Sequence, residues 1–195
     1  NVRSPCNSCQ VPVNLNGLLG YQWPHSGDAY IGLNTFHALG NNLRAYVIAP
    51  LLDTLINDFE YCVEFYVNLG NNCKYASDAI GAYFSSTAPS CPGFSCLLND
   101  TPQVSSTLGI PITDTLNWTK ISGRFIAKGG ERFISIGNFL PDSQLTISIN
   151  DSTLLYSTLY YIDDVFVTLC DSSVAIKEIK STAKASVFPN PSQIG

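Results

Sequence analysis

Two glutamates fall in segments that could place carboxylates across a cleft. Glu64 lies within YCVEFYVNL (61–69) and Glu131 within AKGGERF (127–133). A glycosidase needs two such groups, one of them with a raised pKa. In the alternative interpretation, Glu64 projects from a sheet face as an ordinary polar residue and Glu131 ends a turn. The chain has only two histidines and neither a Gly-x-Ser-x-Gly nor a His-Glu-x-x-His motif, so we predict that it is not an enzyme.

Sugar recognition is a second chemistry that the residue types allow. Aromatic rings stack on the C–H faces of sugars, and polar groups beside them bond to the hydroxyls. An alternating strand over 61–69 places one tyrosine opposite its apolar face, and AIGAYFS (79–85) does the same with another. QWPHSG (22–27) is a turn-like segment that could form a rim, and two further candidates lie near the turn at 39–42. The candidate ligand-binding residues are Trp23, His25, Arg44, Tyr46, Tyr66 and Tyr83. Alternatively, these side chains cover a second sheet or support loops.

The segments that position these residues are mostly strands. Alternating or β-branched patterns predict strands over 61–69, 79–85, 121–127, 132–139, 145–149 and 160–169. Turn-forming clusters such as LGNN, AKGGE and LPDSQ separate them. The one helix candidate is VIAPLLDTLIND (47–58), although Pro50 interrupts it and its β-branched residues favour a strand. Many short strands at regular spacing predict an all-β fold, a jelly-roll β-sandwich.

The composition limits the partners and the surroundings of the protein. The 195 residues fit one domain with a tail, and 45% are hydrophobic, which is enough for a core. Charged residues make up 13%, against the usual share of roughly 25%. A net charge of −5 argues against nucleic acid as a partner, and no apolar stretch approaches the roughly 20 residues of a membrane span. Because the chain contains no Met, we expect Asn1 to mark a processed terminus or a fragment boundary.

Seven cysteines indicate an oxidising compartment. Cys91 and Cys96 flank PGFS, a turn that can bring their sulfur atoms together, so we predict a disulfide between them. A zinc site that joins this pair to Cys6 and Cys9 is the alternative. The odd number leaves one thiol unpaired, and the sequence does not say which.

Five segments in this order resemble a known extracellular module. They are GYQWPHSGDAYIGL (20–33), YCVEFYVNL (61–69), YASDAIGAYFS (75–85), NWTKISGRFIAKGGERFISIGNF (117–139) and YYIDDVFV (160–167). Together they are similar to a module of Bacteroidota with the galactose-binding-like jelly-roll fold that many carbohydrate-binding modules share. FPNPS (188–192) resembles the start of the C-terminal sorting domain of type IX secretion. The resemblance implies a jelly-roll module over 1–170 and a linker-like tail over 171–195.

The resemblance also implies a structural cation and two modification sites. Such modules often hold calcium beside their first and last strands, and the first Asp of a motif like IDDV contributes a ligand. Carried over, this points to Asp163 as a Ca²⁺ ligand, with Asp164 on the opposite side of the strand. The two DTL motifs resemble the Bacteroidota O-glycosylation acceptor, which marks Thr54 and Thr115.

The implied function is a non-catalytic, secreted or cell-surface module that binds a glycan such as a cell-surface polysaccharide, or that mediates adhesion. In this family a first strand with a sequence like NLVPNPSFE precedes the cysteine-bearing loop, and here the chain begins in that loop. We therefore propose that residues from about 174 onward fill the groove of that strand, in their own domain or in a neighbouring one; in the alternative interpretation they are a disordered linker to a sorting domain. The arrangement between neighbouring domains gives the alternative function, self-association into an extracellular fibre by strand complementation.

Overall fold

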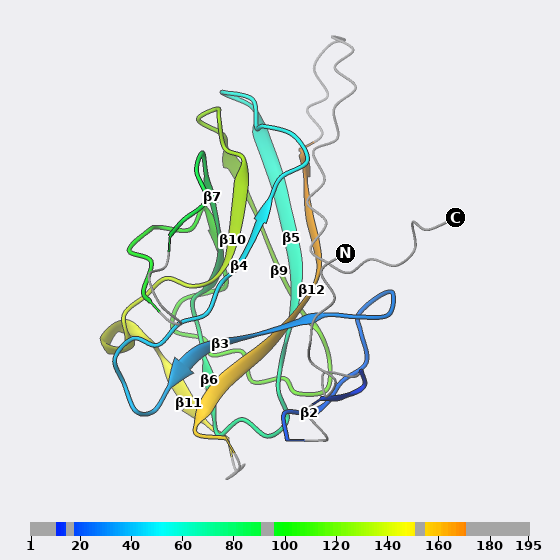
Figure 1. The fold of residues 1–195 in the computed structure, drawn as a ribbon, viewed down its shortest axis with the longest axis vertical. Coiled ribbons are helices and arrows are strands. Elements are labelled where there is room, and N and C mark those ends of the chain that lie inside the picture. Colours follow the sequence, from blue (N-terminus) through cyan, green and yellow to red (C-terminus); the bar gives the residue numbers. More distant parts are fainter. Residues whose placement is uncertain (1–10, 15–17, 91–95, 151–154, 171–195) are drawn as a thin grey trace.

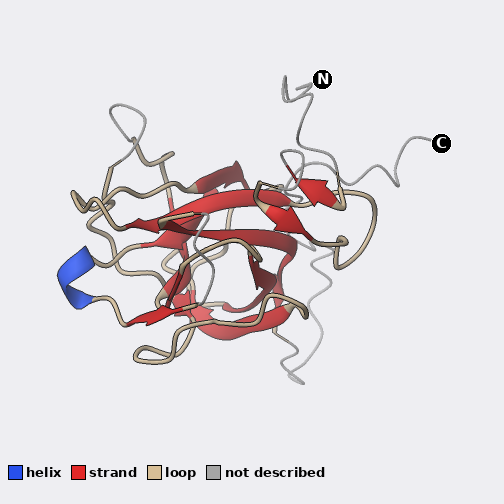
Figure 2. Ribbon diagram, turned by 90° about the horizontal axis from the view of Figure 1, so that it is seen from below, coloured by secondary structure: helices blue, strands red, loops and turns tan. Residues whose placement is uncertain are grey.

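Strands make up nearly all of the regular structure (Figure 1). The computed structural model describes residues 11–14, 18–90, 96–150 and 155–170. The short 3-10 helix η2 (Asp142–Gln144) is the helical turn in Figure 2. The strands are β1 (Val13–Asn14), β2 (Gly20–Tyr21), β3 (Ile31–His37), β4 (Val47–Pro50), β5 (Glu60–Leu69), β6 (Tyr75–Ser77), β7 (Ile80–Ser85), β8 (Val104–Ser105), β9 (Thr119–Ile126), β10 (Phe133–Asn138), β11 (Ile147–Ile149) and β12 (Ser157–Leu169).

The strands form two main antiparallel sheets. The first, here the β5 sheet, has the order β3-β12-β5-β9, and the second, the β7 sheet, has the order β4-β10-β7-β8. Two small sheets, β1-β2 and β11-β6, are added to these. The chain passes repeatedly from one main sheet to the other, as from β3 to β4 and then to β5, which is how a jelly roll is wound. The structure confirms the predicted all-β jelly-roll sandwich.

The core lies between the two main sheets and explains the alternation of β5. Tyr61, Val63, Phe65, Val67 and Leu69 are all buried, and they pack with apolar residues of β7 and β10. The ring of Phe84 on β7 stacks on that of Phe125 on β9, with 4.6 Å between the centroids. Because strand side chains alternate between faces, Cys62, Glu64 and Tyr66 lie on the opposite face of the β5 sheet, here called the outer face.

The one helix candidate is a strand followed by turns, as its Pro50 and its β-branched residues indicate. Val47–Pro50 forms β4, which pairs with β10 from Phe133 to Ile136. β4 is the edge strand of its sheet, and Pro50 is its last residue. An edge strand tolerates proline because one side of it donates no hydrogen bonds to a neighbouring strand. Pairing with β10 therefore decides the conformation of this stretch.

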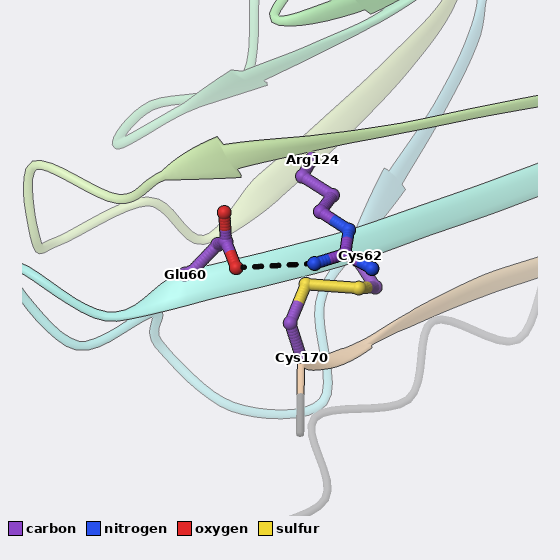
Figure 3. Close-up of a disulfide and its surroundings, with 4 residues drawn as sticks. All are labelled: Glu60, Cys62, Arg124 and Cys170. Atoms are coloured by element: carbon purple, nitrogen blue, oxygen red, sulfur yellow. Dashed lines mark ion pairs between the residues drawn. A yellow bond between two sulfur atoms is a disulfide. The ribbon is translucent and has the colours of Figure 1, made fainter. Parts of the chain in front are cut away.

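A disulfide between Cys62 and Cys170 ties the start of β5 to the end of β12 (Figure 3), with a Cα–Cα distance of 5.0 Å. Within the described residues Cys73 is the free cysteine, and burial raises the pKa of its thiol to about 11. Cys96 is itself disulfide-bonded. Cys91 lies outside the described residues, so the predicted Cys91–Cys96 pairing stays a prediction.

Several expectations concern residues outside the described ranges. These include the loop with Cys6 and Cys9 and the whole of 171–195, with the sorting-domain motif and the tail strand. The domain boundary at 170, the filling of a first-strand groove and self-association through the tail therefore stay predictions. Among the described residues, no helix has the length and apolarity needed to cross a membrane.

Candidate ligand-binding site

The loop over residues 22–30 folds onto the outer face of the β5 sheet and is held there by two carboxylates. The backbone N–H of His25 donates to Asp163 Oδ2 at 2.8 Å. The His25 ring nitrogen Nδ1 lies 2.6 Å from Asp164 Oδ2. The hydroxyl of Ser26 donates to Asp164 Oδ1, also at 2.6 Å. Backbone and side chains of the loop are thus both fixed to β12.

A β-bulge in β12 explains why both aspartates reach this loop. The pairing of β12 with β5 shifts between Asp163 and Phe166, and Asp164 has a φ of 46°. This left-handed residue breaks the alternation that would put neighbouring side chains on opposite faces. The expectation that Asp164 lies on the opposite side of the strand from Asp163 is therefore wrong.

Aromatic side chains gather where the loop meets the sheet. The His25 ring stacks on Tyr66 with 3.7 Å between centroids and 18° between planes. Trp118 lies edge-on to His25, and its indole N–H donates to the carbonyl oxygen of Trp23 at 3.0 Å. Trp23 is 60% exposed. We call this group the aromatic cluster; it comprises Tyr21, Trp23, His25, Tyr30, Tyr66 and Trp118.

A hollow of about 530 Å³ lies on the same face, next to the aromatic cluster. We call it the sheet hollow. Its lining includes Glu64, Lys120, Ser122, Arg124 and Phe166, and the ring of Phe166 is 47% exposed. Tyr66 is two residues from Glu64 on β5 and pairs with Lys120 of β9, so the cluster and the hollow adjoin. Apolar, aromatic and polar groups thus meet on one open surface.

Both cations of the sheet hollow face a carboxylate. Lys120 pairs with Glu64, and this hydrogen bond raises the pKa of Lys120. Arg124 Nη1 lies 3.7 Å from a carboxylate oxygen of Glu60, and Figure 3 shows this pair beside the disulfide. The charge of the hollow is therefore locally balanced.

Three of the six predicted ligand residues lie away from the aromatic cluster: Arg44 and Tyr46 lie in the segment that leads into β4, and Tyr83 lies on β7, and both strands belong to the other sheet. The Arg44 side chain is buried, with Nη2 at 2.7 Å from Asp142 Oδ1 and 2.8 Å from the Leu140 carbonyl oxygen. Tyr46 donates its hydroxyl to the Asn138 carbonyl at 2.8 Å. Tyr83 does not neighbour Tyr66. The structure brings together only Trp23, His25 and Tyr66.

The carboxylate of Asp163 receives hydrogen bonds from backbone amides. Its Oδ2 accepts from His25 and its Oδ1 from the N–H of Asp164, and burial raises its pKa. The described ranges contain no group of three or more His, Cys, Asp or Glu residues placed to hold a metal. Calcium requires six to eight oxygen ligands, which is more than the two aspartates supply by themselves. Calcium at Asp163 stays a prediction.

The other predicted positions have local partners. Thr54 is exposed and its hydroxyl oxygen accepts from Arg132 Nε at 3.2 Å. Thr115 is half-buried and its carbonyl accepts from Asn71 Nδ2 at 3.0 Å. Glycosylation of either stays a prediction. Glu131 is buried in the turn before β10, where it accepts from the N–H of Lys128 at 2.8 Å. It therefore closes a turn, while Glu64 pairs with Lys120 on the outer face.

The sequence reasoning missed Trp118, Tyr30 and Phe166. An alternation signal was present for Trp118, which lies two residues before Lys120 and so on the same face as Lys120 and Ser122. Phe166 follows a bulge that no local pattern marks. Tyr30 reaches Tyr161 only because the loop folds back, with 4.6 Å between the ring centroids.

No protein-family model and no curated protein matches the chain. A solved structure named "PbXyn10C CBM APO", a carbohydrate-binding module, can be aligned with this chain. The alignment covers 84% of this chain and 92% of the chain in that structure. The two are 10% identical in sequence, and the TM-score is 0.34. No family is assigned. A likeness at this score carries no argument, so the fold class rests on the sheets described above.

Proposed function

We propose that the protein binds a neutral glycan on the outer face of the β5 sheet, at the aromatic cluster and the sheet hollow. The observation that carries this proposal is the exposed ring of Trp23 and the stacked pair of His25 and Tyr66 beside an open hollow with polar walls. Sugars combine C–H faces with hydroxyl groups and fit such a mixed surface. The volume of about 530 Å³ lies within the usual range of ligand sites, roughly 300–1,000 Å³.

Charge supports a neutral ligand over an acidic one. Both cations of the hollow face carboxylates, and the whole chain carries a net charge of −5. The net negative charge would repel an acidic polysaccharide at long range. Within the hollow, each cation already has a carboxylate neighbour, so neither is available to offset that repulsion. We propose binding without catalysis, since Glu64 pairs with Lys120 and Glu131 closes a buried turn.

The test is affinity electrophoresis and calorimetry on a panel of neutral polysaccharides that includes xylan, mixed-linkage glucan and mannan. Trp23→Ala and Tyr66→Ala are expected to weaken binding by about tenfold or more, which corresponds to about 1.4 kcal/mol. Tyr156→Ala is the matched control, because this ring is 55% exposed but lies near Lys74 rather than in the cluster. Absence of binding across the panel, or equal losses in Trp23→Ala and Tyr156→Ala, would contradict the proposal.

We further propose that the protein acts outside the cell, at the cell surface or after secretion. The Cys62–Cys170 disulfide and the low share of charged residues support an oxidising, extracellular setting. The resemblance of 188–192 to a type IX sorting motif adds support from sequence alone. Protease treatment of intact cells, with immunoblotting of cells and culture medium, tests this. Protection of the protein inside intact cells would contradict it.

A further inference from the structure

A second hollow adjoins the first across the edge of the β5 sheet. It has a volume of about 400 Å³ and lies between β9 and the segment from β8 to residue 114. We call it the edge hollow. Lys120 and Ser122 line both hollows, so the two open spaces meet over β9.

Strand register gives the direction of the combined groove. Phe166 on β12 pairs with Glu64 on β5, and Glu64 pairs with Ser122 on β9, which places the three residues in one row. Neighbouring strands lie about 4.8 Å apart, so this row is about 10 Å long. β9 is the edge strand of its sheet, and a ligand that follows the row leaves the sheet at Ser122.

The edge hollow offers the same mixture of groups as the sheet hollow. Thr107, Thr113 and Ser105 expose hydroxyl groups, and Ile110 adds an exposed apolar side chain. The wall is held close to β9 because Gly123 leaves room for Val104. A Cβ at Gly123 would lie 2.9 Å from Val104 Cγ1. The close packing of Val104 on Gly123 therefore fixes the wall of the groove, and the groove continues beyond the edge of the β5 sheet.

We propose that the ligand is an extended polysaccharide that lies across the strands along an internal stretch of its chain. It packs on the aromatic cluster and Phe166, crosses β9 over Lys120 and Ser122, and places its next sugar units in the edge hollow. The inference rests on the proposed glycan binding and specifies its ligand as a polymer, in contrast to a single sugar or a chain end. The supporting feature is that open space continues on both sides of β9, which a polysaccharide needs and a single sugar does not.

The experiment measures affinity by calorimetry for cello-, xylo- and manno-oligosaccharides of two to six units. For the series that binds, we expect the hexasaccharide to bind at least about tenfold more tightly than the disaccharide. The double variant Thr107→Tyr/Thr113→Tyr fills the edge hollow and is expected to remove most of this gain while leaving the disaccharide affinity unchanged. Thr101→Tyr, also at an exposed threonine, is the matched control.

The double variant Thr107→Ala/Thr113→Ala, which adds no bulk, is a second probe if the tyrosine variant unfolds, and it is expected to lower hexasaccharide affinity alone. Equal affinity for the disaccharide and hexasaccharide would overturn the inference and leave glycan binding intact. Equal behaviour of the double variants and the control would do the same. Failure of every oligosaccharide and polysaccharide to bind would overturn both the inference and the proposed function.

Discussion

Single polar groups hold the loops of this sandwich in place, and Tyr160 on β12 is a fully buried example. Its hydroxyl accepts from the N–H of Ser77 at 2.9 Å. It also lies 2.9 and 2.8 Å from the carbonyl oxygens of Ser77 and Ile112. Burial raises the pKa of Tyr160, so the hydroxyl keeps its proton and remains a donor. One side chain of the β5 sheet thereby fixes β6 and the loop around Ile112.

Replacing Tyr160 with Phe is expected to lower the free energy of unfolding by about 1–3 kcal/mol. The change leaves the buried N–H of Ser77 without its acceptor while keeping most of the ring packing. Urea unfolding followed by fluorescence measures the loss. Tyr156→Phe, at an exposed ring, is the control and is expected to change little. A similar small effect at Tyr160 would contradict this account.

Asp114 stabilises the turn that leads into β9 and Trp118. Its Oδ1 accepts from the N–H groups of Leu116 and Asn117, each at 2.8 Å. The bond from the Asn117 N–H is the largest cause of its lowered pKa. Because folding lowers this pKa, the stabilising effect is present above the unfolded value of about 3.9 and is lost as the pH falls through the lower folded value.

The variant Asp114→Asn is therefore expected to melt below the wild type at pH 7. The difference between their melting temperatures is expected to shrink to zero as the pH falls below the ordinary aspartate range. Differential scanning calorimetry of both proteins from pH 7 to pH 2 gives this comparison. A difference that persists at the lowest pH would show that the charge of Asp114 is not what matters.

At the scale of elements, β12 does most to organise the site. It pairs with β3 on one side and β5 on the other, and its bulge turns both Asp163 and Asp164 toward the loop over 22–30. Its end is fixed to β5 through Cys170 and Cys62, which are 108 residues apart in sequence. The long separation means that this bond restricts the unfolded chain strongly.

The double variant Cys62→Ser/Cys170→Ser is expected to lose about 2–5 kcal/mol of stability. Changing both residues avoids leaving a free thiol, and unlike reduction with dithiothreitol it leaves the disulfide of Cys96 in place. Guanidinium unfolding measures the loss. Wild type in dithiothreitol is the comparison and is expected to lose at least as much. An unchanged unfolding midpoint in the double variant would contradict the expected role.

The whole molecule is a sandwich in which the two faces of the β5 sheet have different roles: one face packs into the core, and the other is open to solvent. The core between the two main sheets contains the apolar face of β5, whereas the opposite face of that sheet carries the aromatic cluster and the sheet hollow. Tyr83 lies on β7 of the other sheet, whereas Arg44 and Tyr46 lie in the segment before β4, and all three contact η2 or the residues that lead into it. The net charge of −5 for the whole chain and the paired charges in the sheet hollow both favour the proposed neutral ligand over an acidic one.

A test of the whole fold concerns calcium. Since Asp163 already accepts hydrogen bonds from backbone amides at both oxygens, we expect EDTA to leave the melting temperature unchanged. Thermal unfolding in EDTA, in calcium and in magnesium as a control measures this. The cation concentration is on the order of 1 mM, which is enough to occupy weak extracellular calcium sites. A rise in melting temperature that is specific to calcium and absent in Asp163→Asn would establish the cation site instead.

The sequence by itself determined the fold class and the two faces of β5. Apolar residues at 61, 63, 65, 67 and 69 face inward, as their spacing predicts, because a strand reverses its side chains at each residue. The same rule places Tyr66 outward, and the turn residues of AKGGE indicate that Glu131 ends a turn. These features depend on neighbours within a few residues.

Tertiary structure decided which side chains meet. His25 reaches Tyr66 and Asp164 across long stretches of sequence, Cys62 meets Cys170, and Tyr83 is placed in the opposite sheet from Tyr66. A bulge in β12, invisible to periodicity, turns Asp164 to the loop. Local patterns give the direction of a side chain within its strand, but the order of strands in each sheet and the shifts in their register set the partners, and these depend on packing of the whole chain.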